Sequence, residues 1–303
     1  SGDVDVDGTT NLDVVDIDGA VDIDGAISVG NTLTVGVDDT GHDVKFFGAT
    51  ASRHVTWDES ADSLILSGNL DVNDGTIKLD GNYPTGTDNV ALGNTALDSV
   101  EAGGINNVAI GANAGTAITT GDQNTAVGHE ALNANTTAVG NTAIGADALR
   151  GNTTGANNVG VGVCSLRNNE TGGSNTAIGF RAAEDTTSSS NTAIGTCALF
   201  DNSSGANNVA VGKEALGNNT TAGNNTAVGT FSLITNTEGA SNTAVGFESL
   251  RCNTTADNNT AAGRSALRAN TTGANNVAVG SSALTSNVTG AANTAVGTCA
   301  LQN

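Results

Sequence analysis

Asn124-Thr125-Ala126-Val127-Gly128 is a five-residue segment that recurs, with small variations, thirteen times before the end of the chain. The copies begin at residues 89, 107, 124, 141, 158, 175, 191, 208, 225, 242, 259, 276 and 293. Successive copies are separated by 17 residues, except for one step of 18 (89 to 107) and one of 16 (175 to 191). A fixed period of this length predicts a solenoid, in which one short unit of structure stacks on the next.

The segment alternates in polarity and size. With Asn as position zero, position +1 is Thr or Val, +2 is Ala except at Gly160, +3 is apolar and +4 is Gly. Because side chains alternate across a strand, positions +1 and +3 share one face, and Asn, Ala and Gly share the other. A β-branched segment that ends in Gly predicts a short strand followed by a turn.

A second recurring residue, which we call the Leu anchor, stands eight residues after most of the Asn residues. It is Leu, preceded by Ala or Ser, and the remainder of the repeat is rich in turn formers such as Asn152-Thr-Thr-Gly155. We therefore expect each coil to contain two short strands and two turns. Coils stacked about 4.8 Å apart give a rod of roughly 60 Å for thirteen copies. The Leu residues are 97, 132, 149, 166, 199, 216, 233, 250, 267, 284 and 301.

Stacking places the residues of one repeat position above one another in a column, and the columns have different predicted roles. The Asn columns at zero and +11 (Asn135, Asn152, Asn219 and Asn253 among the latter) are expected to form stacked amide ladders. The columns at +1 and +3 form an apolar stripe along one side of the rod. A soluble rod does not leave such a stripe bare, and a closed assembly of three identical rods covers it. We therefore expect an obligate homotrimer.

The repeats resemble those of two families of fibrous proteins. Asn107–Gly111, which reads Asn-Val-Ala-Ile-Gly, is similar to the Asn-Ser-Val-Ala-Ile-Gly head repeats of trimeric autotransporter adhesins. The longer repeat with Asn-Thr-Thr-Gly resembles repeats in tail fibres of bacteriophages, notably marine and cyanobacterial ones. The resemblance covers residues 89–303 and implies an all-β, left-handed parallel β-roll that trimerises through its strands. No coiled-coil stalk or membrane-anchor barrel is recognisable in these residues, which favours the phage fibre over the alternative, a bacterial trimeric surface adhesin or other extracellular fibre.

Composition and charge exclude several classes of function. The chain has 303 residues with 41 Gly, one Trp, one Tyr and no Met, which suits a solenoid better than the core of a globular enzyme. A net charge of −21 argues against binding to nucleic acid or to anionic membranes. We expect a non-enzymatic virion protein outside the cell, with other virion proteins and a host cell-surface glycan or protein as partners.

Residues 1–37 alternate Val or Ile with Asp, as in Val21-Asp-Ile-Asp-Gly25, and predict an acidic, repetitive β-shaft. Asp3, Asp5, Asp7 and Gly8 match the opening of a calcium-binding loop, but Val14 stands where that loop needs Glu. A solvated acidic face is the favoured interpretation, and weak binding of Ca²⁺ is the alternative. No other cofactor or metal is expected.

Residues 38–88 predict a small β domain and a connector. Alternation in Val44–Phe46 and Leu64–Leu66 indicates strands, and the sequence around Trp57 resembles a recurrent segment of phage tail fibres. Trp57 with His54 and Asp58 suggests either a sugar-binding patch or an apolar plug that joins three chains. The plug is the favoured interpretation.

Within the roll, positions +5 and +6 vary freely, which predicts that their side chains lie outside. The candidate partner contacts are Phe180, Arg181, Phe231 and Phe247 there, with Trp57 in the small domain, and shielding of neighbouring turns is the favoured alternative. No catalytic constellation is apparent. Cys164, Cys197, Cys252 and Cys299 lie in the turns and are expected to be free thiols, with interchain pairing as the alternative.

Overall fold

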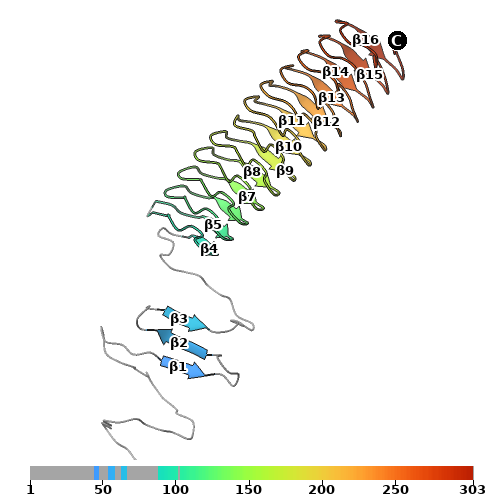
Figure 1. The fold of residues 1–303 in the computed structure, drawn as a ribbon. Helices are drawn as coiled ribbons and strands as arrows, with labels where there is room; N and C mark the ends of the chain where they lie inside the picture. Colours follow the sequence, from blue (N-terminus) through green and yellow to red (C-terminus); the bar gives the residue numbers. More distant parts are fainter. Residues whose placement is uncertain (1–43, 48–53, 59–62, 67–87, 102, 303) are drawn as a thin grey trace, which may run out of the picture. The chain divides into compact units, whose positions relative to one another are not determined.

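The chain divides into two compact units, Ser1–Ile77 and Lys78–Asn303 (Figure 1). The computed structural model describes residues 44–47, 54–58, 63–66, 88–101 and 103–302. The predicted acidic shaft of residues 1–37, with Asp3, Asp5 and Asp7, lies outside these residues. Each unit is described by itself below.

The first unit contains a three-stranded antiparallel sheet. Its strands are β1 (Val44–Phe47), β2 (His54–Asp58) and β3 (Ser63–Leu66), with β2 in the centre. Phe46 lies opposite Val55, and Trp57 lies between Val44 and Leu64. The strands predicted from the alternation in Val44–Phe46 and Leu64–Leu66 are therefore confirmed.

The second unit is a parallel β-solenoid, which we call the roll. Thirteen three-residue strands stack in chain order, each hydrogen-bonded to the strands before and after it (Figure 1). The register never slips: Thr226, Ala227 and Val228 pair with Thr243, Ala244 and Val245. The strands are β4 (Val90–Leu92), β5 (Val108–Ile110), β6 (Thr125–Val127), β7 (Thr142–Ile144), β8 (Val159–Val161), β9 (Thr176–Ile178), β10 (Thr192–Ile194), β11 (Val209–Val211), β12 (Thr226–Val228), β13 (Thr243–Val245), β14 (Thr260–Ala262), β15 (Val277–Val279) and β16 (Thr294–Val296).

Each coil contains one strand, not the two that we predicted. The segment around the Leu anchor is a run of turns, in which positions +6 and +8 have left-handed backbone angles, as at Glu214 (φ 53°) and Leu216 (φ 51°). A residue in this region cannot continue a strand. The segment still stacks in register, because the Leu216 N–H donates to the carbonyl of Ser232 in the next coil at 3.0 Å.

The core is a thin set of small-residue columns. The Ala residues at +2, the Ala or Ser at +7 and the Leu at +8 are buried through most of the roll. A Leu in the left-handed region costs about 1–2 kcal/mol. Burial of its side chain contributes about 1.5–3 kcal/mol, which is enough to offset that penalty.

Two ladders of Asn side chains run through the interior, as predicted. In the ladder at position zero, the Asn225 N–H donates to Asn208 Oδ1 at 3.0 Å, and Asn225 Nδ2 donates to the carbonyl of Gly239 at 2.9 Å. In the ladder at +11, Asn236 Nδ2 donates to Asn219 Oδ1 at 3.0 Å. The ladders supply the hydrogen bonds that a buried turn needs from its surroundings.

Backbone packing explains the Gly at +4. In this column φ lies between 124° and 140°, a region that residues with a side chain rarely adopt. A Cβ at Gly229 would lie 2.5 Å from the carbonyl oxygen of Gly246 in the next coil. The strand can turn sharply and stack closely only because no side chain is present there.

Candidate functional site

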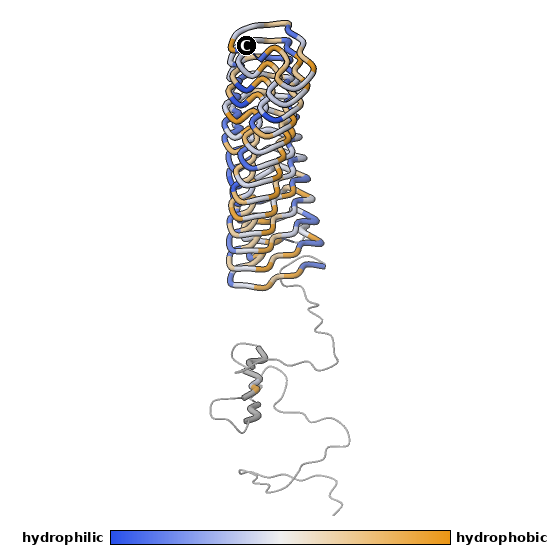
Figure 2. The backbone as a smooth tube through the Cα atoms, turned by 90° about the vertical axis from the view of Figure 1, so that its right-hand side faces the viewer, coloured by the Kyte–Doolittle hydropathy of each residue, from blue (hydrophilic) through white to orange (hydrophobic). Residues whose placement is uncertain are grey.

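An apolar stripe runs along the strands on the outside of the roll. The side chains at +1 are half-buried, apart from the exposed Thr294 in the last coil. Nine of the thirteen residues at +3 are between 36% and 71% exposed. Figure 2 shows hydrophobic segments, in orange, repeating from coil to coil. The predicted stripe is therefore present in the single chain, and its exposed members are Leu92, Ile110, Ile144, Ile178, Ile194, Val228, Val245, Val279 and Val296.

Positions +5 to +10, which we call the variable face, carry the side chains with the most varied chemistry. From residue 89 onwards, all seven Lys and Arg, all four Phe, all four Cys and the single His lie at these positions. They are the residue types that bind ligands by charge or by stacking. The variable face is therefore the part of the roll on which a partner site can be sought.

The predicted contact residues in the roll fall into two groups. Phe180 and Phe247, both at +5, are 51% and 42% exposed, as expected for outward side chains. Phe231 lies at +6 and is half-buried, so its side chain is only partly outside. Its ring packs edge-to-face against Phe247, with 6.3 Å between the ring centroids and 68° between the planes. Two of the candidates thus form one aromatic pair.

Trp57 does not belong to this group. It lies in the central strand of the three-stranded sheet, in the first unit, and its backbone pairs with Val44 and Leu64. His54 and Asp58 are the first and last residues of the same strand. Both interpretations of this segment, a sugar-binding patch and an apolar plug, stay predictions.

Arg181 has a role inside the roll. Its guanidinium forms an ion pair with Glu184, and its Cζ lies 4.4 Å from the centroid of the Phe200 ring. Glu184 is only 4% exposed and also lies 3.7 Å from Arg167 Nη1. A buried carboxylate needs such partners, so Arg181 stabilises the roll. Its side chain remains 41% exposed, and its contact with a partner stays a prediction.

The coil that contains Glu184 is the irregular one, with 16 residues. Ala183 stands where other coils have the Leu anchor, and Thr186 stands in the Asn ladder at +11. Within the described residues, Asn169 Oδ1 and Thr186 Oγ1 have no hydrogen-bond partner, so the ladder is interrupted here. Sequence reasoning missed the buried Glu184, although the short step from 175 to 191 marked this coil as different.

No disulfide joins Cys164, Cys197, Cys252 and Cys299 to one another within the chain. Interchain pairing stays the alternative prediction. Burial is the main cause that raises the pKa of the Cys164 thiol, and Glu184 adds to it. Burial likewise raises the pKa of Cys197. These two thiols stay protonated at neutral pH and are therefore poor nucleophiles.

One cluster of side chains has the composition of a metal site. The ligand atoms of His129, Glu130 and Asp147 lie within 4.8 Å of one another. However, Arg150 Nε lies 2.7 Å from Glu130 Oε2, so a guanidinium already neutralises this carboxylate. Ion pairing on the variable face accounts for the cluster, and we assign no metal to it.

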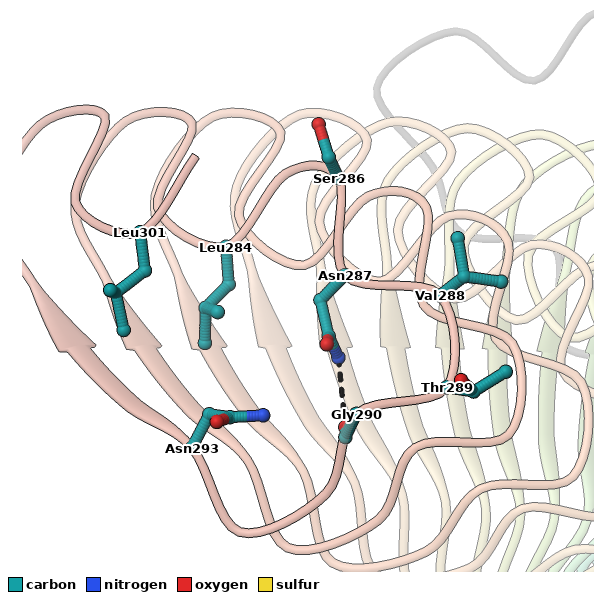
Figure 3. Close-up of a pocket in the computed structure, with 8 residues that line it drawn as sticks. All are labelled: Leu284, Ser286, Asn287, Val288, Thr289, Gly290, Asn293 and Leu301. Atoms are coloured by element: carbon teal, nitrogen blue, oxygen red, sulfur yellow. Dashed lines mark hydrogen bonds between the residues drawn. The ribbon is translucent and has the colours of Figure 1, made fainter. Parts of the chain in front are cut away.

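A hollow of about 370 Å³ lies at the end of the roll (Figure 3). The residues that line it stand at repeat positions that, in earlier coils, are covered by the next coil. Among them are Leu284 and Leu301, the Leu residues at +8. Asn287 Nδ2 donates to the carbonyl of Gly290 at 2.9 Å, which is the ladder contact. No ionisable side chain lines this hollow, so it follows from the stacking and offers no groups for catalysis. The other residues that line it are Ser286, Val288, Thr289 and Asn293.

The described residues contain no helix with the length and apolar character needed to cross a bilayer. Comparison with protein-family models, with curated protein sequences and with solved structures gives no match.

Proposed function

We propose that this protein is a structural fibre of a virion, a tail fibre that reaches from the particle to the host cell and takes part in attachment. In this proposal three copies form a trimer of left-handed β-rolls outside the cell, and residues 1–37 form a shaft. Its partners are other virion proteins and a host cell-surface glycan or protein. It has no enzymatic activity.

One observation carries the proposal: the apolar stripe continues along a stack of thirteen in-register strands. Exposed apolar area of this extent is rare on a soluble monomer and indicates an interface. The stripe repeats with every coil, so its partner must present a matching repeat. A second and a third copy of the same chain, closed about a threefold axis, provide it.

The chemistry of the variable face supports a role without catalysis. Hydrolysis of a glycoside needs two carboxyl groups at a defined separation on either side of the bond. The carboxylates of Glu130, Glu184 and Glu248 are each bound to an Arg. Asp147, whose carboxylate lies within 4.8 Å of that of Glu130, is likewise paired with Arg167 at 3.9 Å. Such groups stabilise the stack of coils and do not form an acid–base pair.

The assembly is tested by light scattering coupled to size-exclusion chromatography. A particle of three chains, seen by negative-stain electron microscopy as a thin rod, supports the fibre. A well-folded monomer contradicts it. Shortening of a bacterial capsule polysaccharide on incubation with the protein contradicts the absence of enzymatic activity.

Attachment is tested with fluorescently labelled protein on a panel of bacterial strains that includes marine cyanobacteria. Binding to a subset of strains, competed by unlabelled protein, supports attachment. The alternative, a bacterial trimeric surface adhesin, is favoured by the Asn107–Gly111 repeat. Neighbouring genes that encode tail proteins support the fibre, and a gene that continues into an outer-membrane barrel supports the adhesin.

A further inference from the structure

Lys213, Phe231, Phe247 and Arg264 lie in four successive coils and form what we call the aromatic–cation patch. Lys213, Phe247 and Arg264 are at position +5, and Phe231 is at +6. Because successive coils are about 4.8 Å apart, the patch extends about 14 Å along the roll from Lys213 to Arg264. It is therefore long and narrow and follows the axis of the roll.

The two aromatic rings of the patch are held by contacts with each other and with Lys213. Phe247 is the more exposed ring, and the half-buried Phe231 packs against it edge-to-face at 6.3 Å. Lys213 Nζ lies 5.5 Å from the centroid of the Phe231 ring. These contacts restrict the rings before any ligand arrives, which lowers the entropic cost of binding.

The charged side chains in and around the patch differ in whether they already have a partner of opposite charge. The exposed side chain of Arg264 makes no hydrogen bond or ion pair with the described residues, whereas Lys213 Nζ lies 3.4 Å from Glu214 Oε1. Glu248 is already neutralised, because Arg268 Nε lies 2.8 Å and Arg251 Nε 3.7 Å from its carboxylate oxygens.

Between +5 and +9 of these coils, four cations therefore face two carboxylates. The cations are Lys213, Arg251, Arg264 and Arg268, and the carboxylates are Glu214 and Glu248. This part of a chain with net charge −21 is locally positive, so it attracts an anionic partner.

We propose that the aromatic–cation patch binds an extended acidic glycan, with the apolar face of one sugar ring on Phe247 and sugar carboxylates paired with Arg264 and Lys213. The inference rests on the proposed attachment function and names the class of its partner. Every strand from β5 to β15 is paired on both sides, so the roll offers no free backbone edge there to an extended peptide. A row of aromatic rings and cations instead suits a ligand in which each unit carries an apolar face and a negative charge.

The experiment is isothermal titration calorimetry of the full chain with a galacturonic acid oligomer at low ionic strength. Maltohexaose, which has no carboxylate, is the neutral comparison. We expect binding of the acidic oligomer that weakens with added salt, because the charged contacts are exposed to solvent. Phe247→Ala and Arg264→Ala should each raise the Kd about tenfold or more.

Two matched variants control for changes outside the patch. Phe180→Ala removes another exposed +5 ring four coils away, and Ser281→Ala alters the +5 position next to Arg264. Both should bind like the unaltered protein. Thermal melting of all variants checks that each remains folded, which is expected because Phe247 and Arg264 are exposed.

Three results would overturn the inference: no binding of the acidic oligomer, equal binding of maltohexaose, or unchanged binding by both patch variants. Tighter binding of a poly-glutamate peptide would also overturn it, in favour of an acidic protein partner. The two proposals fail separately. A trimer that attaches to cells without binding the oligomer retains the fibre function, and a protein that binds the oligomer without attaching to any cell retains the glycan site.

Discussion

At the scale of single residues, the Gly column at +4 is the least tolerant part of the roll. Gly229→Ala places a Cβ 2.5 Å from the Gly246 carbonyl oxygen, at a φ of 138°. We expect a loss of about 2 kcal/mol or more in the free energy of unfolding, because strain and overlap add. Denaturant unfolding measures it.

Gly217→Ala is the matched control. Its φ is not in the left-handed region, and the nearest atom to an added Cβ is the Glu214 carbonyl oxygen at 3.3 Å. Other coils have Arg251 and Arg268 at the same position. This variant should be nearly as stable as the unaltered protein, and an equal loss in the two variants would contradict the explanation from backbone packing.

Asp201 makes stability depend on pH. Burial, followed by the nearby carboxylate of Asp185, raises the pKa of Asp201 above its usual value. A carboxyl whose pKa is higher in the folded chain contributes stability below its unfolded pKa, and this contribution is lost as the pH rises through the folded pKa. Asp201→Asn should therefore stabilise the protein at pH 7, by less than about 1 kcal/mol, because the site is partly exposed.

The melting temperature at pH 7 and at pH 3 measures this effect. The difference between Asp201→Asn and the unaltered protein should disappear at pH 3, where Asp201 is protonated. Asn218 occupies the same position in the next coil. Asn218→Asp should lower the melting temperature at pH 7, and a variant that is stabilised instead would refute the role of like charges.

Sequence reasoning located the buried columns but not their backbone. Ala at +2 and Leu at +8 could be identified because they recur. The left-handed angle of Leu216 could not, because a branched side chain disfavours this region by itself. Only the next coil, which buries the side chain and accepts the Leu216 N–H, stabilises that conformation.

At the scale of the coil, each unit depends on the Asn ladders for hydrogen bonds. Asn236 Nδ2 donates to Asn219 Oδ1, and Asn236 Oδ1 accepts from Asn253 at 2.8 Å. Asn236→Thr should cost about 1–3 kcal/mol, because it leaves a buried acceptor without a donor. Thermal unfolding of the purified protein measures this loss.

Thr186→Asn is the reverse change, in the coil where the ladder is interrupted. Asn169 Oδ1 lacks a donor there, and the amide of a new Asn can supply one. We expect a gain of about 1 kcal/mol. A loss as large as that of Asn236→Thr would mean that the shorter coil holds residue 186 out of line with the ladder.

Of the two strands predicted for each coil, the one at +1 to +3 is present and the one at the Leu residue is not. The β-branched residues at +1 and +3 alternate with Ala in all coils except those with Leu92, Gly160 and Ala262, which is a direct signal for a strand. The Leu anchor carries no such alternation, and its buried side chain suggested a strand that the backbone does not form. The ion pairs of Glu184 were equally hidden, because residues from two different coils make them.

At the scale of the whole molecule, the period alone was enough to predict a solenoid. A repeat of 17 residues with a conserved pattern places each coil against its neighbours, so the second unit follows from one coil. Its assembly does not follow in the same way. The apolar stripe indicates that a partner exists. Two rods about a twofold axis would also form a closed assembly, so the choice of three copies rests on the resemblance to trimeric fibres.

Val228→Asp tests that assembly. Val228 lies in the exposed column at +3 of β12. In a trimer closed through this stripe, each copy would bury a new carboxylate without a partner, which is strongly unfavourable. The three chains together carry three times −21 charges, −63, so the added charges also oppose association. We expect the particle to fall from three chains of 29.6 kDa to one.

Thr230→Asp adds the same charge two residues away, at position +5 of the variable face. It should leave the trimer intact, because that position lies outside the stripe, between Lys213 and Phe247 in the series of +5 residues. Light scattering distinguishes the outcomes, and a melting temperature that rises with protein concentration identifies an assembly coupled to folding. If Val228→Asp and Thr230→Asp give particles of the same mass, the stripe is not the surface through which the chains associate.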